Sequence, residues 1–412
     1  MNGVNGKDTG AQPFTIETEI AIIGGGLSGT LAAVTLARAG HDVTLIDRHA
    51  VYPPDFRVEK IGGEQTEILR RLGLLDALDA SATAFDEIVN ARRGRILDRT
   101  RTRHYGFLYQ DLVATMRAQM PGTVRFVVGR VEDLKTGVDR QTVSILNQGT
   151  VNARLVILAT GMGDVLRRSL GIGRRFIHQR QSLTFGFTVK PVAEQGFRYP
   201  ALTYYGEKVA DGIDYLSLFP ITGGTRANLF TFRDHRDPWV KTFRENPKET
   251  LLATLPGLPK VLGEFEIVDR VQNWLMDIAV AENCRQAGVV VIGDAYQTSC
   301  PAAGTGVGRL LTDVERLCTV HIPRWMQTSG IPASKIGAFY DDAEKQAVDQ
   351  RALRLAEYRR SLTVATDLRW RAHRLMLLSR RRVVDSIDRN VPAVGATLRL
   401  LRGRAREVAA GR

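Results

Sequence analysis

The chain begins with two apolar strand patterns that flank a helical one. Ile20–Ile23 is a continuous apolar run, which is typical of a buried parallel strand. Leu27–Arg38 consists mainly of good helix formers with few polar residues, and His41–Asp47 again has the pattern of a strand. The order predicts a strand, a helix and a second strand, with a glycine-rich turn after the first strand.

The same arrangement returns far along the chain, where Val289–Ile292 leads into a polar loop and a glycine-rich turn before a predicted helix. Between the two arrangements, residues 180–233 alternate apolar and polar positions around glycine, proline and aspartate turns, which predicts antiparallel strands. Residues 246–265 contain proline breaks that are typical of short helices. From residue 331 onward the pattern is mostly helical.

Composition is that of an ordinary globular protein, with 44% hydrophobic and 25% charged residues. No apolar run is long enough to span a bilayer, and the polar residues 1–16 predict a disordered tail without the pattern of a secretory signal. We therefore expect a cytoplasmic protein. The cysteines, Cys284, Cys300 and Cys318, lack both a disulfide framework and zinc-binding spacing, so no metal site is predicted.

A formal net charge of +13 indicates which partners to expect. Most of the excess lies in residues 340–412, and such a surface favours phosphorylated cofactors, anionic lipid or an acidic carrier protein. The apolar Leu375–Leu378 precedes the basic Arg380–Arg382, which predicts either peripheral membrane contact or a solvated outer helix. No helix-turn-helix, zinc-finger or RNA-recognition motif is present, so nucleic acid is not an expected partner.

The first glycine-rich turn, residues 24–29, has the chemistry of a dinucleotide site. We call it the fingerprint turn, and its residues are Gly24, Gly25, Gly26, Leu27, Ser28 and Gly29. The first glycine permits the tight turn, the second lets the backbone approach a pyrophosphate, and the third lets helix and strand pack closely. Asp47 ends the second strand, where its carboxylate can accept both ribose hydroxyls. Arg48 either neutralises a phosphate or is a solvated surface arginine.

The fingerprint turn does not separate NAD from FAD, whereas the second turn does. Residues 289–308 resemble the GD motif of the single-component aromatic hydroxylases, the para-hydroxybenzoate hydroxylase family. The resemblance implies that Asp294 bonds the ribityl hydroxyls of FAD. It also implies that the flavin ring packs on the turn formed by Pro301, Gly304, Thr305, Gly306 and Val307. A glycine backbone can lie flat on the ring, and a helix N-terminus stabilises the negative charge of reduced flavin.

Further segments resemble the same family. Residues 55–74 are similar to a segment in which an arginine reaches the FAD pyrophosphate, which implies that role for Arg57. Residues 108–120 imply a cofactor contact for Gln110, although both segments can also be ordinary helix starts. Val131 would present its backbone to adenine. The family's Asp-Gly pair is Thr160-Gly161 here, so the charge that assists nicotinamide contacts is missing.

The resemblance implies an FAD-dependent monooxygenase that inserts one oxygen atom of O2 into an aromatic or natural-product-like substrate through a flavin C4a-hydroperoxide. Electrons would come from NADH, NADPH or a separate flavin reductase. Three alternatives remain open: an FAD-dependent reductase of a polyprenyl or lipid-like substrate, a flavin-dependent halogenase, and a non-enzymatic flavin-binding module. The halogenase branch has a WxWxIP motif, absent here, and a lysine for which Lys60 is a candidate.

The predicted fold is α/β, with a Rossmann-like FAD-binding domain of the glutathione-reductase type and an inserted antiparallel β-sheet substrate domain. The FAD-binding domain is expected to comprise residues 17–175 and 285–330, the substrate domain residues 176–284, and a basic helical region residues 331–412. No catalytic side chain is predicted, because the cofactor performs the bond chemistry. His104, His178 and His235 are expected at the surface or in the core, and the aromatic residues of the substrate strands mainly in the core.

Overall fold

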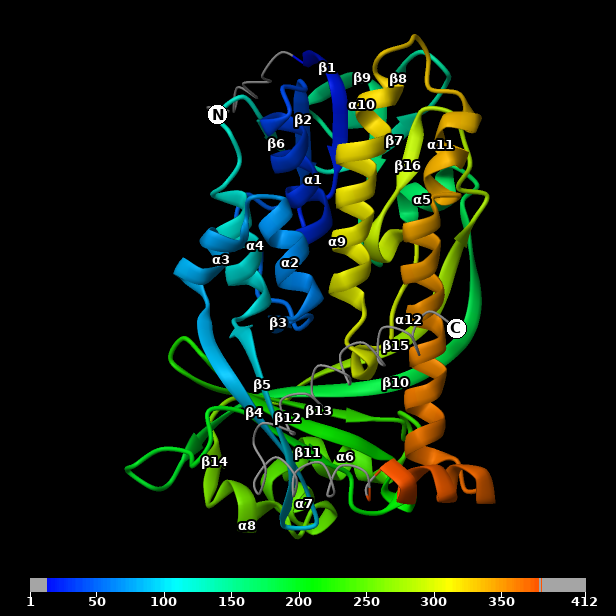
Figure 1. Cartoon of the computed structure of the whole chain (residues 1–412). Coiled ribbons are helices and arrows are strands. Elements are labelled where there is room, and N and C mark those ends of the chain that lie inside the picture. Colours follow the sequence, from blue (N-terminus) through cyan, green and yellow to red (C-terminus); the bar gives the residue numbers. More distant parts are fainter. Residues whose placement is uncertain (1–12, 378, 380–412) are drawn as a thin grey trace, which may run out of the picture.

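The computed structural model describes residues 13–377 and residue 379, which form two lobes, each built on one β-sheet (Figure 1). The sheet of the first lobe has seven strands in the order β6-β2-β1-β9-β8-β7, with β16 paired to β9. The sheet of the second lobe has nine strands in the order β14-β10-β13-β12-β11-β4-β5-β3, with β15 paired to β10. Both the α/β fold and the mainly antiparallel second sheet, in which β11 and β4 pair in parallel, agree with the prediction from sequence.

The first sheet is parallel at its centre, where β6, β2, β1, β9 and β16 pair side by side. Its apolar run Ile20–Ile23 is buried, because it belongs to one apolar cluster with residues of the helices and of the strands β7 and β8. The strands of this sheet are β1 (Phe14–Ile23), β2 (Val43–Asp47), β6 (Arg125–Val128), β7 (Val131–Lys135), β8 (Gln141–Ile145), β9 (Gly149–Leu158) and β16 (Val289–Val291).

Helices surround the first sheet, and the first of them has the predicted bounds. The helices of this lobe are α1 (Leu27–Arg38), α2 (Glu64–Arg71), α3 (Leu75–Ser81), α4 (Tyr109–Arg117), α5 (Val165–Ser169), α9 (Gly306–Arg316), α10 (Ile322–Trp325) and α11 (Ala333–Tyr340). Helix α12 (Ala343–Val364) lies against α9 and continues downward to the second lobe (Figure 1).

The second sheet packs one face on short helices, α6 (Pro238–Glu245), α7 (Pro247–Thr254) and α8 (Leu258–Leu262), which agrees with the proline breaks. Its other face turns toward the first lobe (Figure 1). The strands of this sheet are β3 (Lys60–Gly62), β4 (Thr83–Arg92), β5 (Arg95–Gly106), β10 (Gly173–Pro191), β11 (Leu202–Tyr205), β12 (Ile213–Ile221), β13 (Gly224–Thr231), β14 (Phe265–Ile267) and β15 (Gln272–Glu282).

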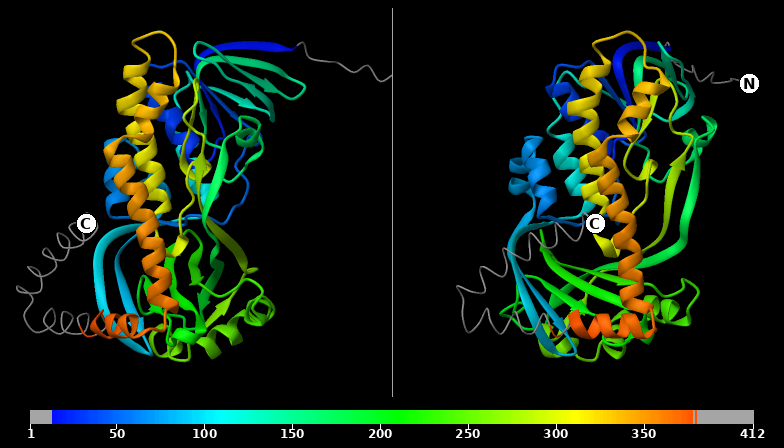
Figure 2. Two further views of the ribbon diagram at one scale, coloured as in Figure 1. Left: turned by 90° about the vertical axis from the view of Figure 1, so that its right-hand side faces the viewer. Right: turned by 45° about the vertical axis from the view of Figure 1, so that its right-hand side comes forward.

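The long strand β10 joins the lobes. It pairs with β15 from Gly173 opposite Glu282 to Gly186 opposite Gln272, with register shifts between Phe176 and Ser182. The resulting two-stranded ribbon curves from the first lobe into the second sheet (Figure 2). Helix α12 is bonded to β10 at Gln181, so the two strands of the ribbon and this helix span both lobes.

The structure corrects two predicted boundaries. Strand β1 begins at Phe14, inside the predicted tail of residues 1–16, because Phe14 pairs with Gly149 at the end of β9. Strands β3, β4 and β5 lie in the second sheet, although residues 60–106 were assigned to the first part of the FAD-binding domain. The chain therefore enters the second lobe before residue 176, and the reason is that β4 pairs with β11.

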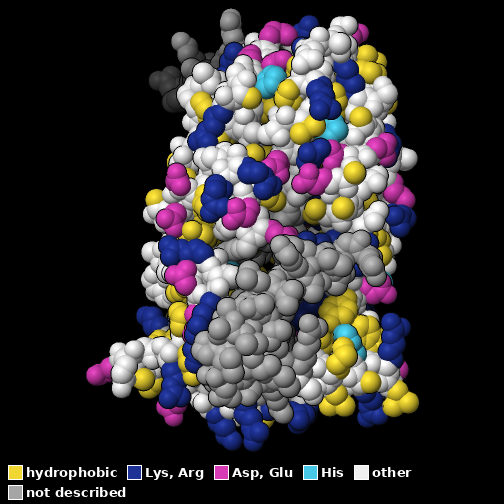
Figure 3. Space-filling view, viewed as in Figure 1, with side chains coloured by type: hydrophobic (Ala, Val, Ile, Leu, Met, Phe, Trp, Pro, Cys, Tyr) yellow, Lys and Arg dark blue, Asp and Glu magenta, His cyan; other side chains and the backbone are white. Residues whose placement is uncertain are grey.

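The C-terminal part is described only as far as residues 377 and 379. Within it Leu375 and Met376 are 67% and 55% exposed, whereas Arg380–Arg382 lie outside the described residues. Membrane contact through this region stays a prediction. No helix in the described ranges combines the length and apolarity that crossing a membrane needs. Basic side chains gather along the lower edge of the second lobe, whereas acidic and basic ones intermingle on the first (Figure 3).

Candidate flavin and substrate site

The fingerprint turn is closed by contacts that only glycine permits. Gly24 has φ +105°, and a Cβ on it would lie 2.5 Å from the carbonyl oxygen of Ala159. A Cβ on Gly29 would lie 1.8 Å from the carbonyl oxygen of Gly24. Helix α1 therefore starts with Gly26 as its N-cap, and the backbone reaches the edge of the sheet without an obstructing side chain.

Asp47 holds this turn from the neighbouring strand. Its carboxylate accepts the N–H of Gly25 at 2.6 Å and the N–H of His49 at 2.8 Å. Each carboxylate oxygen has further acceptor capacity, so a ribose hydroxyl can still bind there. Arg48, the next residue, is exposed.

Sequence reasoning missed Arg117 and Tyr109, which complete the turn from helix α4. The buried guanidinium of Arg117 donates to the carbonyl of Gly25 at 2.7 and 3.0 Å, and the Tyr109 hydroxyl lies 3.4 Å from the N–H of Leu27. Gln110, which was predicted to contact the cofactor, is partly buried in the first turn of the same helix. The available signal was an arginine on the apolar face of that segment, two turns after Gln110.

The second glycine turn, residues 293–308, is named here the cradle turn. It leaves β16, forms short 3-10 turns at Gly293–Ala295 and Pro301–Ala303, and enters α9 at Gly306. A Cβ on Gly293 would lie 2.4 Å from the hydroxyl of Ser28. The cradle turn and the fingerprint turn therefore lie side by side, as two parts of one site.

Arg57 lies beside the cradle turn. Its Nη1 is 3.4 Å from the carboxylate of Asp294, its Nε donates to Asp55 at 2.6 Å, and its guanidinium lies 4.9 Å from the centre of the Trp274 ring. Burial disfavours its charge, but the carboxylates of Asp294 and Asp55 outweigh burial and raise the pKa of Arg57. The structure thus brings Arg57 and Asp294 together, although their predicted contacts were with different parts of the cofactor.

The surface of the cradle turn fits a flat, hydrogen-bonding ring. The buried hydroxyls of Thr305 and Ser299 have no hydrogen-bond partner among the described residues. Positions where a Cβ would meet nothing within 4 Å occur at Gly161, Gly304 and Gly308. Buried polar groups without partners are uncommon in folded proteins, so these atoms indicate a ligand. The isoalloxazine ring of FAD offers both the flat face and the polar edge that they need.

The other predicted positions surround this surface. Arg174 donates to the carbonyls of Gly161 and Asp294 at 3.2 and 2.7 Å, and so joins the Thr160-Gly161 pair to the cradle turn. The Thr160 hydroxyl donates to the carbonyl of Gly163 at 3.3 Å. Val307, the second residue of α9, is buried in the core, and Val131 is the first residue of β7.

A buried charge cluster supports the cradle turn from behind. The carboxylate of Asp313 accepts the N–H of Gly293 at 2.9 Å, and Arg309 donates to the carbonyls of Gly293 and Gln297. Lys345 of α12, only 1% exposed, donates to Asp313 at 2.8 Å and to Asp349 at 2.9 Å. Two charged side chains of α12, Lys345 and Asp349, thus support Asp313 and Arg309 of α9, which bond the cradle turn. The sequence analysis identified none of the four.

The second lobe meets the cradle turn through strand β12. The Tyr215 hydroxyl donates to the carbonyl of Ala302 at 3.1 Å. Ser217 and Phe219 lie on the same face of the strand as Tyr215, because Leu216 and Leu218 point into the core on the other face. We call this face of β12 the substrate face.

Lys60, the first residue of β3, lies against the substrate face. Its amine donates to the Ser217 hydroxyl at 3.2 Å and lies 5.4 Å from the centre of the Phe219 ring. Among the described residues no carboxylate is within 4.0 Å of it. Burial lowers the pKa of Lys60 to about 8. Nearby on the same sheet, the buried oxygens of Asn228 and Thr184 have no hydrogen-bond partner within the part of the chain that is described.

The predicted histidines do not form an acid–base pair in this site. His104 stacks on Phe85 with ring centres 5.6 Å apart, and burial lowers its pKa. His178 is exposed on β10, and His235 lies beside Asp234. Cys300 is fully buried in an apolar cluster between the cradle turn and the sheet.

Comparison with known proteins identifies the cofactor. A family model described as FAD binding domain matches residues 17–320. The kynurenine 3-monooxygenase of Salinispora arenicola is 25% identical over 393 residues, which cover 86% of this chain and 81% of that protein. The 3-demethoxyubiquinol 3-hydroxylase of Escherichia coli is 25% identical and covers 74% of this chain and 80% of its own.

Solved structures share the fold. A p-nitrophenol 4-monooxygenase from Pseudomonas putida superposes with a TM-score of 0.72 at 18% identity and covers 97% of this chain and 99% of its own. An aklavinone-11 hydroxylase, solved with FAD and aklavinone, gives a TM-score of 0.66 at 22% identity, with 84% of this chain and 69% of that chain covered.

Proposed function

The chain belongs to the FAD binding domain family and is an FAD-dependent monooxygenase, and we propose that it hydroxylates an aromatic substrate held between the cradle turn and the substrate face. When bound and reduced, FAD supplies the chemistry, which is the activation of O2 and the transfer of one oxygen atom. Relatives named for kynurenine, aklavinone and demethoxyubiquinol support an aromatic or natural-product-like substrate.

The two glycine turns would hold opposite ends of FAD. The N-terminus of α1 offers N–H groups and a positive dipole to the pyrophosphate, and the carboxylate of Asp47 offers acceptors to the ribose. At the other end, the N-terminus of α9 would stabilise negative charge on the reduced ring, and the hydroxyl of Thr305, which has no partner among the described residues, would be free to bond a polar edge of the ring.

The main support for the proposal is the hydrogen bond from Tyr215 to Ala302, because it places the substrate face next to the cradle turn. Lys60 beside that face is a half-buried cation without a carboxylate partner among the described residues, so an oxygen anion of the substrate can take that place. A cation beside a phenol favours the phenolate, whose ring is richer in electrons and more reactive toward electrophilic oxygen. Asn228 and Thr184 offer further hydrogen bonds to polar groups of the substrate.

The direct test is oxygen incorporation. FAD-loaded protein is incubated with 18O2, a panel of phenols and quinones, and NADH, NADPH or a separate flavin reductase with reduced flavin. We expect a hydroxylated product that carries one 18O atom. Bleaching of the flavin that does not recover in air would instead support a reductase, and a product that requires halide would support a halogenase.

A pH profile tests the role of Lys60. The charged amine predominates below pH about 8, so kcat/KM for a phenol should fall as pH rises through about 8. We expect Lys60→Met to lose about tenfold in kcat/KM at pH 7 and to lack this limb. The exposed Lys241→Met is the control and should retain the wild-type profile.

A loss of stability cannot explain the fall in kcat/KM of Lys60→Met, because this substitution is expected to stabilise the folded state. A lowered lysine pKa means that the unfolded state binds more protons between pH about 8 and the ordinary lysine pKa, so burial of charged Lys60 destabilises the folded state most below pH about 8. Lys60→Met should therefore raise the melting temperature at pH 7. A Lys60→Met variant with an unchanged pH profile would contradict the proposed role.

A further inference from the structure

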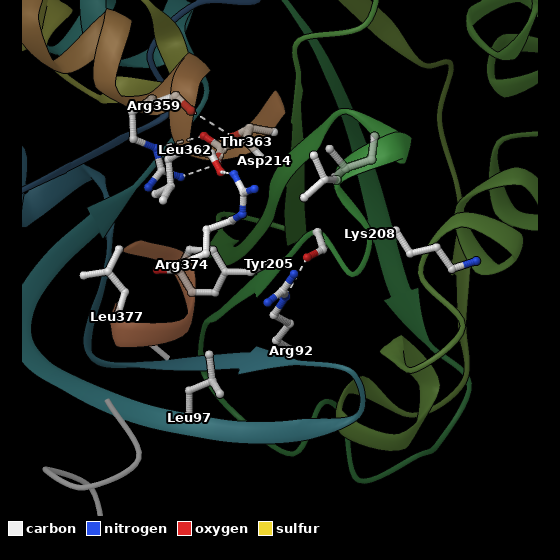
Figure 4. A pocket seen from close by; sticks show the side chains of 13 residues that line it. Arg92, Leu97, Tyr205, Lys208, Asp214, Arg359, Leu362, Thr363, Arg374 and Leu377 are labelled. Atoms are coloured by element: carbon white, nitrogen blue, oxygen red, sulfur yellow. Dashed lines mark hydrogen bonds and ion pairs between the residues drawn. The ribbon is translucent and has the colours of Figure 1, made fainter. Parts of the chain in front are cut away.

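A basic pocket beside the substrate face has no role in the chemistry described so far. It lies at the second lobe, between the β4–β5 hairpin, the start of β12, the end of α12 and the helical residues 368–377 (Figure 4). Its empty volume is about 620 Å³ when the open mouth is counted, but the space available to water-sized groups inside it is about 90 Å³. About 10–15 Å³ on this measure holds one water molecule, so the pocket has room for a small charged group such as a carboxylate, with the rest of a ligand in the open mouth.

Positive charge dominates the polar lining of this pocket. Arg359 is paired with the buried Asp214 through two hydrogen bonds of 2.6 and 2.9 Å, so these two charges cancel locally. Arg92 and Arg374 come from opposite sides, with the Tyr205 ring between them (Figure 4). No carboxylate among the described residues lies within 4.0 Å of either guanidinium. Lys208 also belongs to the lining but extends away from this cluster (Figure 4).

Neutral groups orient both arginines without removing their charge. Arg92 donates to the carbonyls of Gly206 and Glu207 at 2.7 and 3.2 Å, and Arg374 to those of Leu362 and Ala365 at 3.0 and 2.8 Å. Burial and then the charges of Arg93 and Arg374 lower the pKa of Arg92. Two guanidinium groups that repel each other are stabilised by an anion placed between them.

The rest of the lining is mostly apolar, and its Tyr205 ring packs beside Tyr215 of the substrate face. The pocket walls include the side chains of Leu97, Ile213, Leu362 and Leu377. Tyr205 lies 6.3 Å from Tyr215, ring centre to ring centre, and Tyr215 contacts the cradle turn at Ala302. Arg359 also lies 5.1 Å from the centre of the Tyr215 ring. A ligand anchored in the pocket thus has the tyrosine pair between its charged end and the flavin site.

We propose that this pocket binds the carboxylate of an aromatic acid, and that the substrate of the enzyme carries such a group at the end remote from the hydroxylated ring. This inference rests on the proposed function for its use in catalysis, although binding itself does not. A carboxylate matches the planar guanidinium fork, and an aromatic body matches Tyr205 and the leucine walls.

Equilibrium binding to the FAD-loaded full chain tests the proposal without turnover. The probes are 2-naphthoate, its neutral methyl ester and the cationic 2-naphthylmethylamine, with affinities measured by calorimetry. We expect 2-naphthoate to bind about tenfold more tightly than the ester, since a charged hydrogen-bonded pair contributes roughly that much. The amine should bind most weakly. Equal affinities for the acid and the ester would overturn the proposal, and this comparison needs no variant.

Charge removal then localises the site. Arg374→Gln should lose about tenfold in affinity for 2-naphthoate and little for the ester, and Arg374→Lys should retain part of the difference. The control is Arg371→Gln, which removes the same charge from an exposed position in the same helical segment and should bind like the wild type. Unchanged discrimination in Arg374→Gln would overturn the assignment to this pocket.

A last arm distinguishes the source of the anion. Phosphate at high concentration weakens binding at any guanidinium pair, so the test compares two competitors: NADPH that displaces 2-naphthoate much more strongly than the same concentration of inorganic phosphate would identify a site for the electron donor and overturn the carboxylate proposal. The proposed function fails separately, since loss of 18O incorporation with intact naphthoate selectivity would leave the pocket assigned and the chemistry wrong.

Discussion

The fingerprint turn and the cradle turn both carry the chain from a parallel strand into a helix, but different contacts hold them. The fingerprint turn is held within the first lobe, by the carbonyl of Gly24 against Gly29, the carboxylate of Asp47 on the N–H of Gly25 and the guanidinium of Arg117 on the carbonyl of Gly25. The cradle turn depends on α12 through Lys345 and on the second lobe through Tyr215. One turn is thus held by its own glycine packing and by side chains of the first lobe, whereas the other is also held by side chains from α12 and the second lobe.

The difference has a functional reason. A pyrophosphate needs a rigid backbone surface of one shape, which local glycine packing provides. A flavin ring must sit at a set position relative to the substrate, so its cradle is attached to the elements that bind the substrate. The cradle turn is therefore bonded to the second lobe through Tyr215, whereas Asp47, Tyr109 and Arg117, which hold the fingerprint turn, belong to the first lobe.

The largest effect expected from this comparison comes from an alanine in each turn. Gly29→Ala places a Cβ 1.8 Å from the carbonyl oxygen of Gly24, so we expect FAD affinity to fall by more than about 100-fold, or no folded protein. Gly308→Ala meets no atom within 4 Å and should raise the stability of α9 by up to about 1 kcal/mol. Flavin fluorescence quenching and circular dichroism measure both. Wild-type FAD binding by Gly29→Ala would contradict local closure of the fingerprint turn.

A smaller loss should follow removal of the buried cation behind the cradle turn. Lys345→Met leaves the carboxylates of Asp313 and Asp349 buried without their main partner, which costs about 3–5 kcal/mol of unfolding free energy. Adding Asp349→Asn should restore part of the loss, because one of the two like charges is removed. Urea unfolding measures each variant, with the exposed Lys241→Met as control. If Lys345→Met unfolds at the wild-type urea concentration, distant support of the cradle turn is refuted.

The smallest effect concerns one hydroxyl. Thr305→Val removes a buried oxygen without a partner in the described chain, so the stability of the FAD-free protein should be unchanged or slightly higher. FAD affinity should fall about tenfold if the flavin is the missing partner. Thr312→Val gives the opposite pattern, since its hydroxyl donates to the carbonyl of Gly308 within α9: stability falls and affinity stays. Equal FAD affinity in wild type and Thr305→Val would remove Thr305 from the flavin site.

The same comparison explains what sequence could predict. The bounds of α1 follow from a helical pattern between two glycines, and the strand–turn–helix order of both turns follows from continuous apolar runs. The resemblance of residues 289–308 to a family motif predicted the cradle turn, because such a motif reflects a local backbone conformation. All these features depend on residues that are close together in the chain.

What the sequence could not predict depends on pairings across long separations. Arg57 was expected at the pyrophosphate but meets Asp294, 237 positions later, through the path of the chain after β2. Strands β3, β4 and β5 join the second sheet because β4 pairs with β11, and no local pattern states that partner. The role of Lys345 was hidden for the same reason, since a lysine in a polar helix usually faces solvent.

The ribbon formed by β10 and β15 has a consequence for how the molecule comes apart. Its strands pair from the level of the first lobe into the second sheet, with irregular pairing between Phe176 and Ser182, so we expect the unfolding of one lobe to disrupt the other. We therefore expect the scanning calorimetry trace to contain one heat-absorption peak. Two resolved peaks would mean that the ribbon melts between them and that the lobes are thermally independent.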